Sequence, residues 1–118
     1  EKVSIAQFLN EQIPDLVAVY QFGSQAEARL PHDVDVAVLA RDPIPTEQRF
    51  HIAQEPAIQL HREVDLLDLR IASTVMRRQV LTTGQCLDTK NLQPKAEFEM
   101  YTYADYARLN EERRDLLK

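Results

Sequence analysis

The sequence predicts one α/β domain in which a small mixed β-sheet has helices packed largely on one face and is followed by a long C-terminal helix. Three apolar, β-branched runs, at residues 17–22, 34–39 and 64–69, alternate with stretches of helical periodicity. A length of 118 residues supports one hydrophobic core, and no repeat or Gly/Ser-rich linker divides the sequence. We expect a single domain over 1–118, with its core at about 1–88 and a C-terminal helical segment at about 94–117.

The first two expected strands are joined by a polar loop that begins at a glycine. The run VAVYQF ends at Gly23-Ser24, where glycine permits backbone angles that a Cβ disfavours. The second run starts with Asp33 and Asp35, which project from one strand face about 6–7 Å apart. These carboxylates repel each other unless a cation lies between them, and Mg²⁺ binds carboxylate oxygens together with phosphates. The pattern indicates phosphoryl or nucleotidyl transfer; the alternative is a solvated strand end.

Further acidic and loop residues lie near this pair. Asp65 and Asp68 are three positions apart on the third expected strand, so their side chains point to opposite faces and only one can join the pair. The other is expected to be a strand-edge charge. Within the loop, residues 25–29 favour a short helix start, and His32 is either an exposed residue or a ligand contact.

Amphipathic patterns predict three helices around the strands. The first covers residues 3–13 and the second about 46–62, with an interruption at Pro56 and with core-facing Phe50, Ile52, Ala53, Ala57, Ile58 and Leu60. The third begins at Ser73 and ends at Gly84 as a left-handed cap, with Val75, Met76, Val80 and Leu81 facing inward. Its adjacent Arg77 and Arg78 are expected at the surface, and residues 85–87 are expected to form a short edge strand.

The C-terminal segment has more aromatic surface than one buried stripe requires. Pro94 suits the first turn of a helix, and Tyr101, Tyr103 and Tyr106 are spread around its circumference. Part of this surface contacts a partner, or the helix folds back to cover the sheet. The sequence leaves both possibilities open.

Composition excludes several classes of protein. With 14 basic and 19 acidic residues the net charge is −5, so DNA and RNA are not expected partners. No apolar run is long enough to cross a membrane, and Cys86, the one cysteine, cannot form an intrachain disulfide and is expected to be buried. We expect a cytoplasmic protein.

The run Phe22-Gly23-Ser24, a polar loop, Asp33-Val34-Asp35 and the following apolar strand resemble the signature of the nucleotidyltransferase superfamily. The resemblance is strongest to the minimal nucleotidyltransferases (MNT), the antitoxin components of HEPN/MNT toxin–antitoxin pairs. It extends downstream through Glu63-Val64-Asp65-Leu66-Leu67-Asp68-Leu69 and covers roughly residues 5 to 87.

The resemblance implies a function and a role for each motif residue. Gly23 and Ser24 would bind the triphosphate of ATP, and Asp33, Asp35 and Asp65 would be the catalytic, metal-binding carboxylates, holding two Mg²⁺ ions. It is the resemblance that favours Asp65 over Asp68. The implied enzyme is an ATP-dependent protein adenylyltransferase that transfers AMP to a tyrosine hydroxyl of a HEPN toxin and so neutralises it.

Two alternatives remain at this point. The eight residues between Ser24 and Asp33 make a shorter loop than is usual in the family, which favours a non-catalytic antitoxin that neutralises its toxin by binding and occlusion. Transfer to a small molecule such as an aminoglycoside is disfavoured, because a chain of this length has no second domain for such an acceptor.

Overall fold

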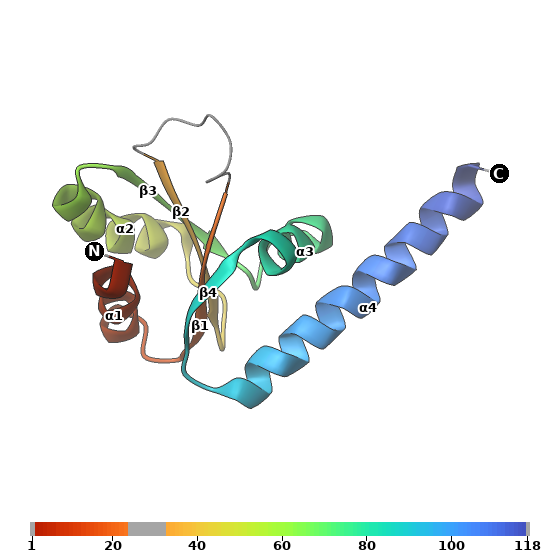
Figure 1. Cartoon of the computed structure of the whole chain (residues 1–118), viewed down its shortest axis with the longest axis horizontal. Helices are drawn as coiled ribbons and strands as arrows, with labels where there is room; N and C mark the ends of the chain where they lie inside the picture. The colour runs from red at the N-terminus through yellow and green to blue at the C-terminus, as the bar shows by residue number, and fades with distance from the viewer. Residues whose placement is uncertain (1, 24–32, 118) are drawn as a thin grey trace.

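A mixed β-sheet forms the centre of the fold. The computed structural model describes the backbone of residues 2–23 and 33–117 and the side chains of residues 5–23 and 34–117. Within these residues one sheet has the strand order β3-β2-β1-β4 (Figure 1). Its strands are β1 (Leu16–Phe22), β2 (Asp33–Ala40), β3 (Glu63–Asp68) and β4 (Gln85–Thr89). β1 is antiparallel to β2 and β4, whereas β2 and β3 are parallel.

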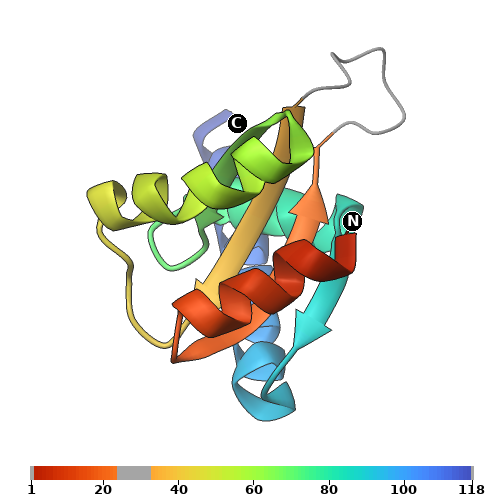
Figure 2. The same cartoon turned by 90° about the vertical axis from the view of Figure 1, so that its left-hand side faces the viewer.

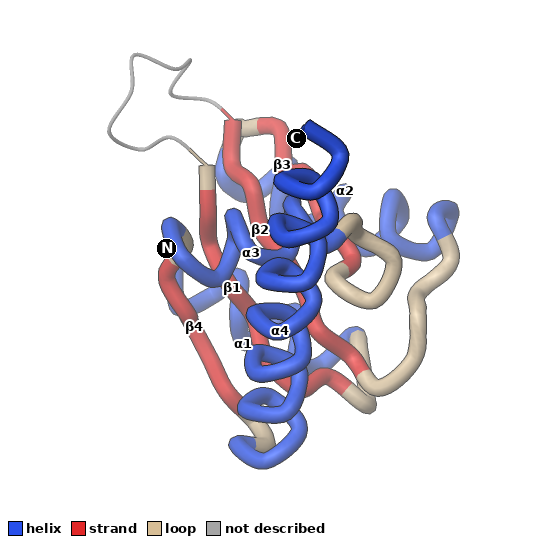
Figure 3. The backbone as a smooth tube through the Cα atoms, turned by 90° about the vertical axis from the view of Figure 1, so that its right-hand side faces the viewer, coloured by secondary structure: helices blue, strands red, loops and turns tan. Residues whose placement is uncertain are grey.

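Helices cover both faces of this sheet. Figure 2 shows α1 (Lys2–Gln12) and α2 (Thr46–Leu60) on one face, and Figure 3 shows α4 (Leu92–Leu117) crossing the other, where α3 (Thr74–Thr83) also packs. The α/β class and the long C-terminal helix are confirmed. The helices, expected largely on one face, are divided between the two because residues 16–20 of β1 and 36–40 of β2 are buried throughout. Two apolar faces require two covering layers.

Helix α2 differs in detail from the prediction. It runs without a break through Pro56, which is buried with Ile52 and Ala53 on the side that faces the sheet. Packing of this side offsets the hydrogen bond that proline cannot donate. Phe50 and Ile58, predicted to face the core, are each 70% exposed. Phe50 lies two residues before Ile52, about 200° around the helix, so burying Ile52 turns Phe50 outward.

Helix α3 begins as predicted and ends for a different reason. Ser73 caps its N-terminus, where the side-chain oxygen accepts from the Met76 N–H at 3.1 Å. Gly84 is not a left-handed cap, because its φ is −88°. Glycine is required there by space: a Cβ would lie 2.5 Å from the Val80 carbonyl oxygen and 3.0 Å from that of Gln21. The prediction that Val75 faces inward is also wrong, since it is exposed.

Helix α4 packs on the sheet with its first half and leaves it with its second. Phe98 and Thr102 are buried, and the Tyr20 hydroxyl on β1 donates to Glu99 Oε2 at 2.9 Å. Lys95 Nζ lies 2.7 Å from the same Glu99 oxygen. Residues 110–117 are exposed, and this end of the helix projects away from the sheet (Figure 1). The first half of the helix therefore covers the sheet, as one of the two predictions has it, whereas a partner contact on the exposed part stays a prediction.

Two surface expectations also need correction. Arg77 is half-buried and donates from Nε to the Leu69 carbonyl at 2.8 Å and from Nη2 to the Arg70 carbonyl at 2.7 Å, so it closes the loop between β3 and α3. Cys86 is exposed rather than buried, because β4 is an edge strand with incomplete cover.

Within the described residues, no helix has the length and apolar character needed to span a membrane.

Asp68 is a buried structural residue and not the strand-edge charge that was predicted. Its side chain is fully buried at the end of β3. Asp68 Oδ2 accepts from the Ile44 N–H at 2.8 Å, and Oδ1 accepts from the Arg70 N–H at 2.9 Å. One carboxylate thus joins the loop before α2 to the loop after β3.

Replacing Asp68 should destabilise the fold without any change of size. In Asp68→Asn the amide nitrogen faces a backbone N–H, and we expect the free energy of unfolding to fall by about 2–3 kcal/mol. Urea denaturation measures this, with Asp42→Asn, an exposed loop acid, as the matched control. Equal effects of the two variants would contradict the structural role of Asp68.

The contact between Tyr20 and α4 should give stability a specific pH dependence. Burial, and then the hydrogen bond to Glu99, raise the pKa of the Tyr20 hydroxyl well above its ordinary value. Because the folded-state pKa is the higher one, the contribution of Tyr20 is complete below the unfolded pKa of about 10 and is lost as pH rises above it. Tyr20→Phe should therefore destabilise by about 1–2 kcal/mol near neutral pH, and the gap from wild type should shrink above about pH 10.

Urea denaturation at several pH values tests this expectation, with Tyr101→Phe, which changes an exposed tyrosine on α4, as control. A gap that stays constant from neutral to alkaline pH would contradict it.

Candidate active site

The strand register brings the predicted carboxylates together at one end of the sheet. In the parallel pair of β2 and β3, Asp35 is opposite Asp65, and Asp33 is opposite Glu63. Residues opposite each other on paired strands project from the same face, with strands about 4.8 Å apart. Asp35 and Asp65, 30 positions apart in the sequence, therefore lie side by side.

Gly23 lies directly against this pair. It follows the last residue of β1, Phe22, which is opposite Asp35 in the antiparallel register. Its φ is +99°, a conformation that residues with a Cβ rarely adopt, and an added Cβ would lie 2.6 Å from Asp35 Oδ2. Glycine is needed here both for the turn and for the close approach of the carboxylate.

The carboxylates lie on the sheet face that α3 and α4 cover. Asp35 lies on the same face of β2 as Ala37 and Leu39, because every second residue of a strand points to the same side. Ala37 and Leu39 pack in one cluster with Val80 of α3 and Phe98 of α4. The C-terminal end of α3 lies beside the acidic end of β1. Gly84 directly follows α3, and a Cβ added to Gly84 would lie 3.3 Å from Phe22 Cβ at the end of β1. The apolar cluster thus supports the strands up to the point where the acidic residues begin.

Asp65 and Asp68 occupy the two environments that the period-two rule requires. Asp65 is exposed beside Asp35, whereas Asp68 points to the other face and is buried. Of Asp65 and Asp68, the geometry therefore leaves Asp65 as the one that can act with Asp35. Glu63 was missed by sequence reasoning, although Glu63-Val64-Asp65 has the same acidic alternation as Asp33-Val34-Asp35.

Several predicted residues lie outside the described part of the chain. These are Ser24, the short helix expected at 25–29 and His32, and for Asp33 the backbone is described but the side chain is not. The sheet position of Asp33 is nevertheless defined by its pairing with Glu63.

The donor set suits a hard divalent cation. The described side chains contain no group of three or more His, Cys, Asp or Glu residues that could hold a metal ion. They do place the carboxylates of Asp35 and Asp65 on neighbouring strands, and the backbone of Asp33 lies two positions before Asp35 on β2. Mg²⁺ is bound through one or two carboxylates together with substrate phosphates, so these residues fit such an ion.

Comparison with known proteins identifies the family. The family model described as polymerase beta, nucleotidyltransferase, matches residues 3–93, most of the chain. The chain belongs to this family. The part of this nucleotidyltransferase that the model matches includes Gly23, Asp33, Asp35 and Asp65.

Similar proteins share nearly the whole length of this nucleotidyltransferase. It is 38% identical over 115 residues to the protein adenylyltransferase MntA of Shewanella oneidensis, a match that covers 96% of this chain and 82% of that protein. A solved structure of tri-AMPylated Shewanella oneidensis HEPN toxin in complex with MNT antitoxin matches with a TM-score of 0.84 and 37% identity, covering 98% of this chain and 92% of the other. A toxin–antitoxin structure with AMP-PNP matches with a TM-score of 0.87 and 37% identity, covering 99% and 95%.

The approach of Gly23 to Asp35 predicts an energetic coupling between the two positions. Gly23→Ala introduces backbone strain and displaces the carboxylate, and we expect it to cost about 1–3 kcal/mol. In an Asp35→Ala background the carboxylate is absent, so the cost should be smaller by about 1 kcal/mol.

A double-mutant cycle measured by urea denaturation tests this coupling. The matched cycle of Gly23→Ala with Asp42→Ala should be additive within about 0.5 kcal/mol, since Asp42 is a distant, exposed loop residue. An additive cycle at Asp35 would mean that the turn and the carboxylate are independent.

Proposed function

We propose that this nucleotidyltransferase is the antitoxin of a HEPN/MNT toxin–antitoxin pair and acts as an ATP-dependent protein adenylyltransferase. It transfers AMP to a tyrosine hydroxyl of its HEPN toxin and thereby neutralises the toxin. The observation that carries the proposal is the strand register that sets Asp35 beside Asp65 and against Gly23. Similarity to the protein adenylyltransferase MntA over 96% of the chain supports the same conclusion.

The site residues have distinct roles in this proposal. Gly23 and Ser24 bind the triphosphate, because a Gly-Ser sequence supplies backbone N–H groups and a hydroxyl that suit phosphate oxygens. Asp33, Asp35 and Asp65 provide the carboxylate oxygens for two Mg²⁺ ions. When bound, Mg²⁺ neutralises negative charge on the phosphates of ATP. Together, the Gly-Ser turn and the three aspartates orient the α-phosphate of ATP toward the acceptor hydroxyl.

The transfer step requires an acceptor that loses a proton. Asp65 is exposed, and it accepts the proton of the tyrosine hydroxyl as the oxygen attacks the α-phosphorus. A new P–O bond forms to the tyrosine oxygen, and the bond between the α-phosphorus and the oxygen bridging to the β-phosphate breaks. Pyrophosphate leaves with that bridging oxygen, and AMP stays on the toxin.

In this proposal the toxin contacts the exposed surface of α4. Met100 and Tyr101 are 59% and 63% exposed, and Leu116 and Leu117 near the end of the helix are also exposed. Large apolar and aromatic side chains of this kind are typical of protein interfaces. We place the complex in the cytoplasm, where ATP is available.

A non-catalytic antitoxin that acts by binding and occlusion is the second candidate. The short loop between Ser24 and Asp33 and the projecting half of α4 favour it. In that case the carboxylates would be dispensable for neutralisation, and α4 would be essential.

One variant separates the two candidates. Asp35→Asn should lower the rate of AMP transfer by about 10²–10³-fold or more, because the amide lacks the negative charge with which Asp35 would hold Mg²⁺ at the phosphates. Intact-mass spectrometry of the HEPN protein after incubation with this enzyme, ATP and Mg²⁺ measures the transfer. Asp42→Asn, which removes an exposed carboxylate outside the site, should retain activity within about twofold.

Full transfer by a folded Asp35→Asn protein would refute the assignment of the site. No mass gain with the wild-type protein, together with a stable complex and protection of cells by Asp35→Asn, would establish occlusion instead.

A further inference from the structure

A cavity of about 470 Å³ lies at the other end of the sheet from the acidic residues. Leu16 and Arg41 are part of its lining, and Leu16 is opposite Ala40 in the register, whereas Phe22 is opposite Asp35. Six residue steps along β1 correspond to about 20 Å. The cavity is therefore separate from the candidate active site.

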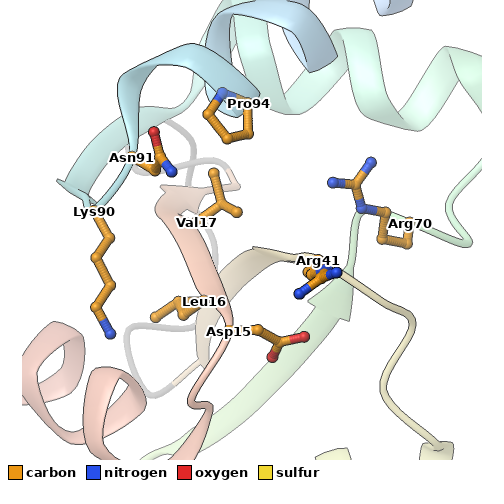
Figure 4. A pocket seen from close by; sticks show the side chains of 8 residues that line it. All are labelled: Asp15, Leu16, Val17, Arg41, Arg70, Lys90, Asn91 and Pro94. Carbon is orange, nitrogen blue, oxygen red and sulfur yellow. The ribbon is translucent and has the colours of Figure 1, made fainter.

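The charged side chains that line the cavity are mostly positive. Arg41, Arg70 and Lys90 contribute three cations, and Asp15 contributes one carboxylate (Figure 4). In the described part of the chain none of these four side chains forms an ion pair. A surplus of two positive charges here contrasts with the net charge of −5 on the whole protein. The local field favours an anion.

Arg70 is held in place before any ligand arrives. Its Nε donates to the Ala40 carbonyl at 2.7 Å, and its guanidinium group stacks on the Phe98 ring, 5.6 Å from the centroid. Its two terminal nitrogens make no hydrogen bond to any described residue, so they can still donate. A guanidinium already fixed in orientation loses little conformational entropy when it binds an oxyanion.

The start of α4 adds to the positive potential. Asn91 and Pro94, on either side of the first residue of this 26-residue helix, are part of the cavity wall. The N-terminus of a helix carries a partial positive charge and backbone N–H groups without intrahelical partners. Figure 4 shows Lys90 and Asn91 on one side of the cavity and Arg70 on the opposite side, with Arg41 between Arg70 and Asp15.

We propose that this cavity binds a phosphorylated small molecule. A phosphoryl dianion matches the surplus of two positive charges, and the fork of Arg70 suits the oxygens of a phosphate. Leu16, Val17 and Pro94 provide an apolar wall for the rest of the ligand, and Asp15 can accept a hydrogen bond from its hydroxyl or amino group. The volume falls in the range of about 300–1,000 Å³ that is usual for small-molecule sites.

Titration with pyrophosphate, followed by amide NMR on the full chain, tests the proposal. Metal-free buffer at about 0.15 M salt limits binding at the carboxylates and screens long-range attraction. Backbone amides of Val17, Arg41, Lys90 and Asn91 should shift saturably, with a Kd of about 1 mM or tighter. Citrate, a tricarboxylate, should bind at least about fivefold more weakly. Absence of saturable shifts, or equal binding of citrate, would overturn the proposal.

Paired charge variants show whether the lining itself binds the anion. Arg41→Gln with Lys90→Gln removes two exposed cations that hold no other described side chain, and should raise the Kd at least about tenfold. Arg113→Gln with Arg114→Gln removes the same charge from the exposed end of α4 and should change the Kd less than about twofold. An equal rise in the Kd for both pairs of variants would mean that the anion responds only to the net charge of the protein, which would contradict a site in this cavity.

Arg70→Lys tests the role of the fixed guanidinium, because it keeps the charge and loses the fork. Its fold is checked by urea denaturation, since Arg70 also bonds to the Ala40 carbonyl. A folded variant with unchanged affinity would remove Arg70 from the site.

Discussion

The register between β2 and β3 is the constraint on which the rest of the structure depends. A shift by one residue would turn Asp65 away from Asp35 and onto the face covered by α1 and α2. Two hydrogen bonds beyond the end of β3 reinforce this register: Leu69 N–H to the Val38 carbonyl at 3.0 Å, and Arg70 Nε to the Ala40 carbonyl at 2.7 Å. Both lie at the end of the sheet remote from the acidic residues. The repulsion between the carboxylates is therefore resisted by apolar strand pairing and by contacts elsewhere.

The loop that follows β3 connects the sheet to α3 and α4. Asp68 accepts hydrogen bonds from the Arg70 N–H in this loop and from the Ile44 N–H in the loop before α2. Arg77 of α3 donates to two carbonyls of the loop after β3. The guanidinium groups of Arg70 and Arg77 stack on Phe98 of α4, 5.6 and 5.3 Å from the ring centroid. The same contacts that hold the first half of α4 on the sheet make Arg70 a rigid wall of the cavity at the far end. At the other end of α4, residues 110–117 are exposed.

Much of the fold followed from local patterns, and the errors have a common origin. The strand runs, the turn at Gly23, the cap at Ser73 and the start of α4 near Pro94 each depend on chemistry within a few residues. Phe50 and Asp68 were misplaced because their burial depends on how α2 and β3 are rotated against neighbours far away in the sequence. Gly84 is required by two carbonyl oxygens, that of Val80 in α3 and that of Gln21 on β1, and only the second lies far away in the sequence.

For the candidate site, the sequence by itself determined the two acidic positions on β2, the glycine turn before them and membership of the nucleotidyltransferase family. These are local features, because a period of two and a glycine-dependent turn act over a few residues. The tertiary structure alone decided that Asp65 lies beside Asp35, that Glu63 is opposite Asp33, and that four charged residues from four separate loops line one cavity. These positions depend on which distant segments of the chain pack together. Neither the spacing nor the periodicity of residues along the sequence specifies that packing.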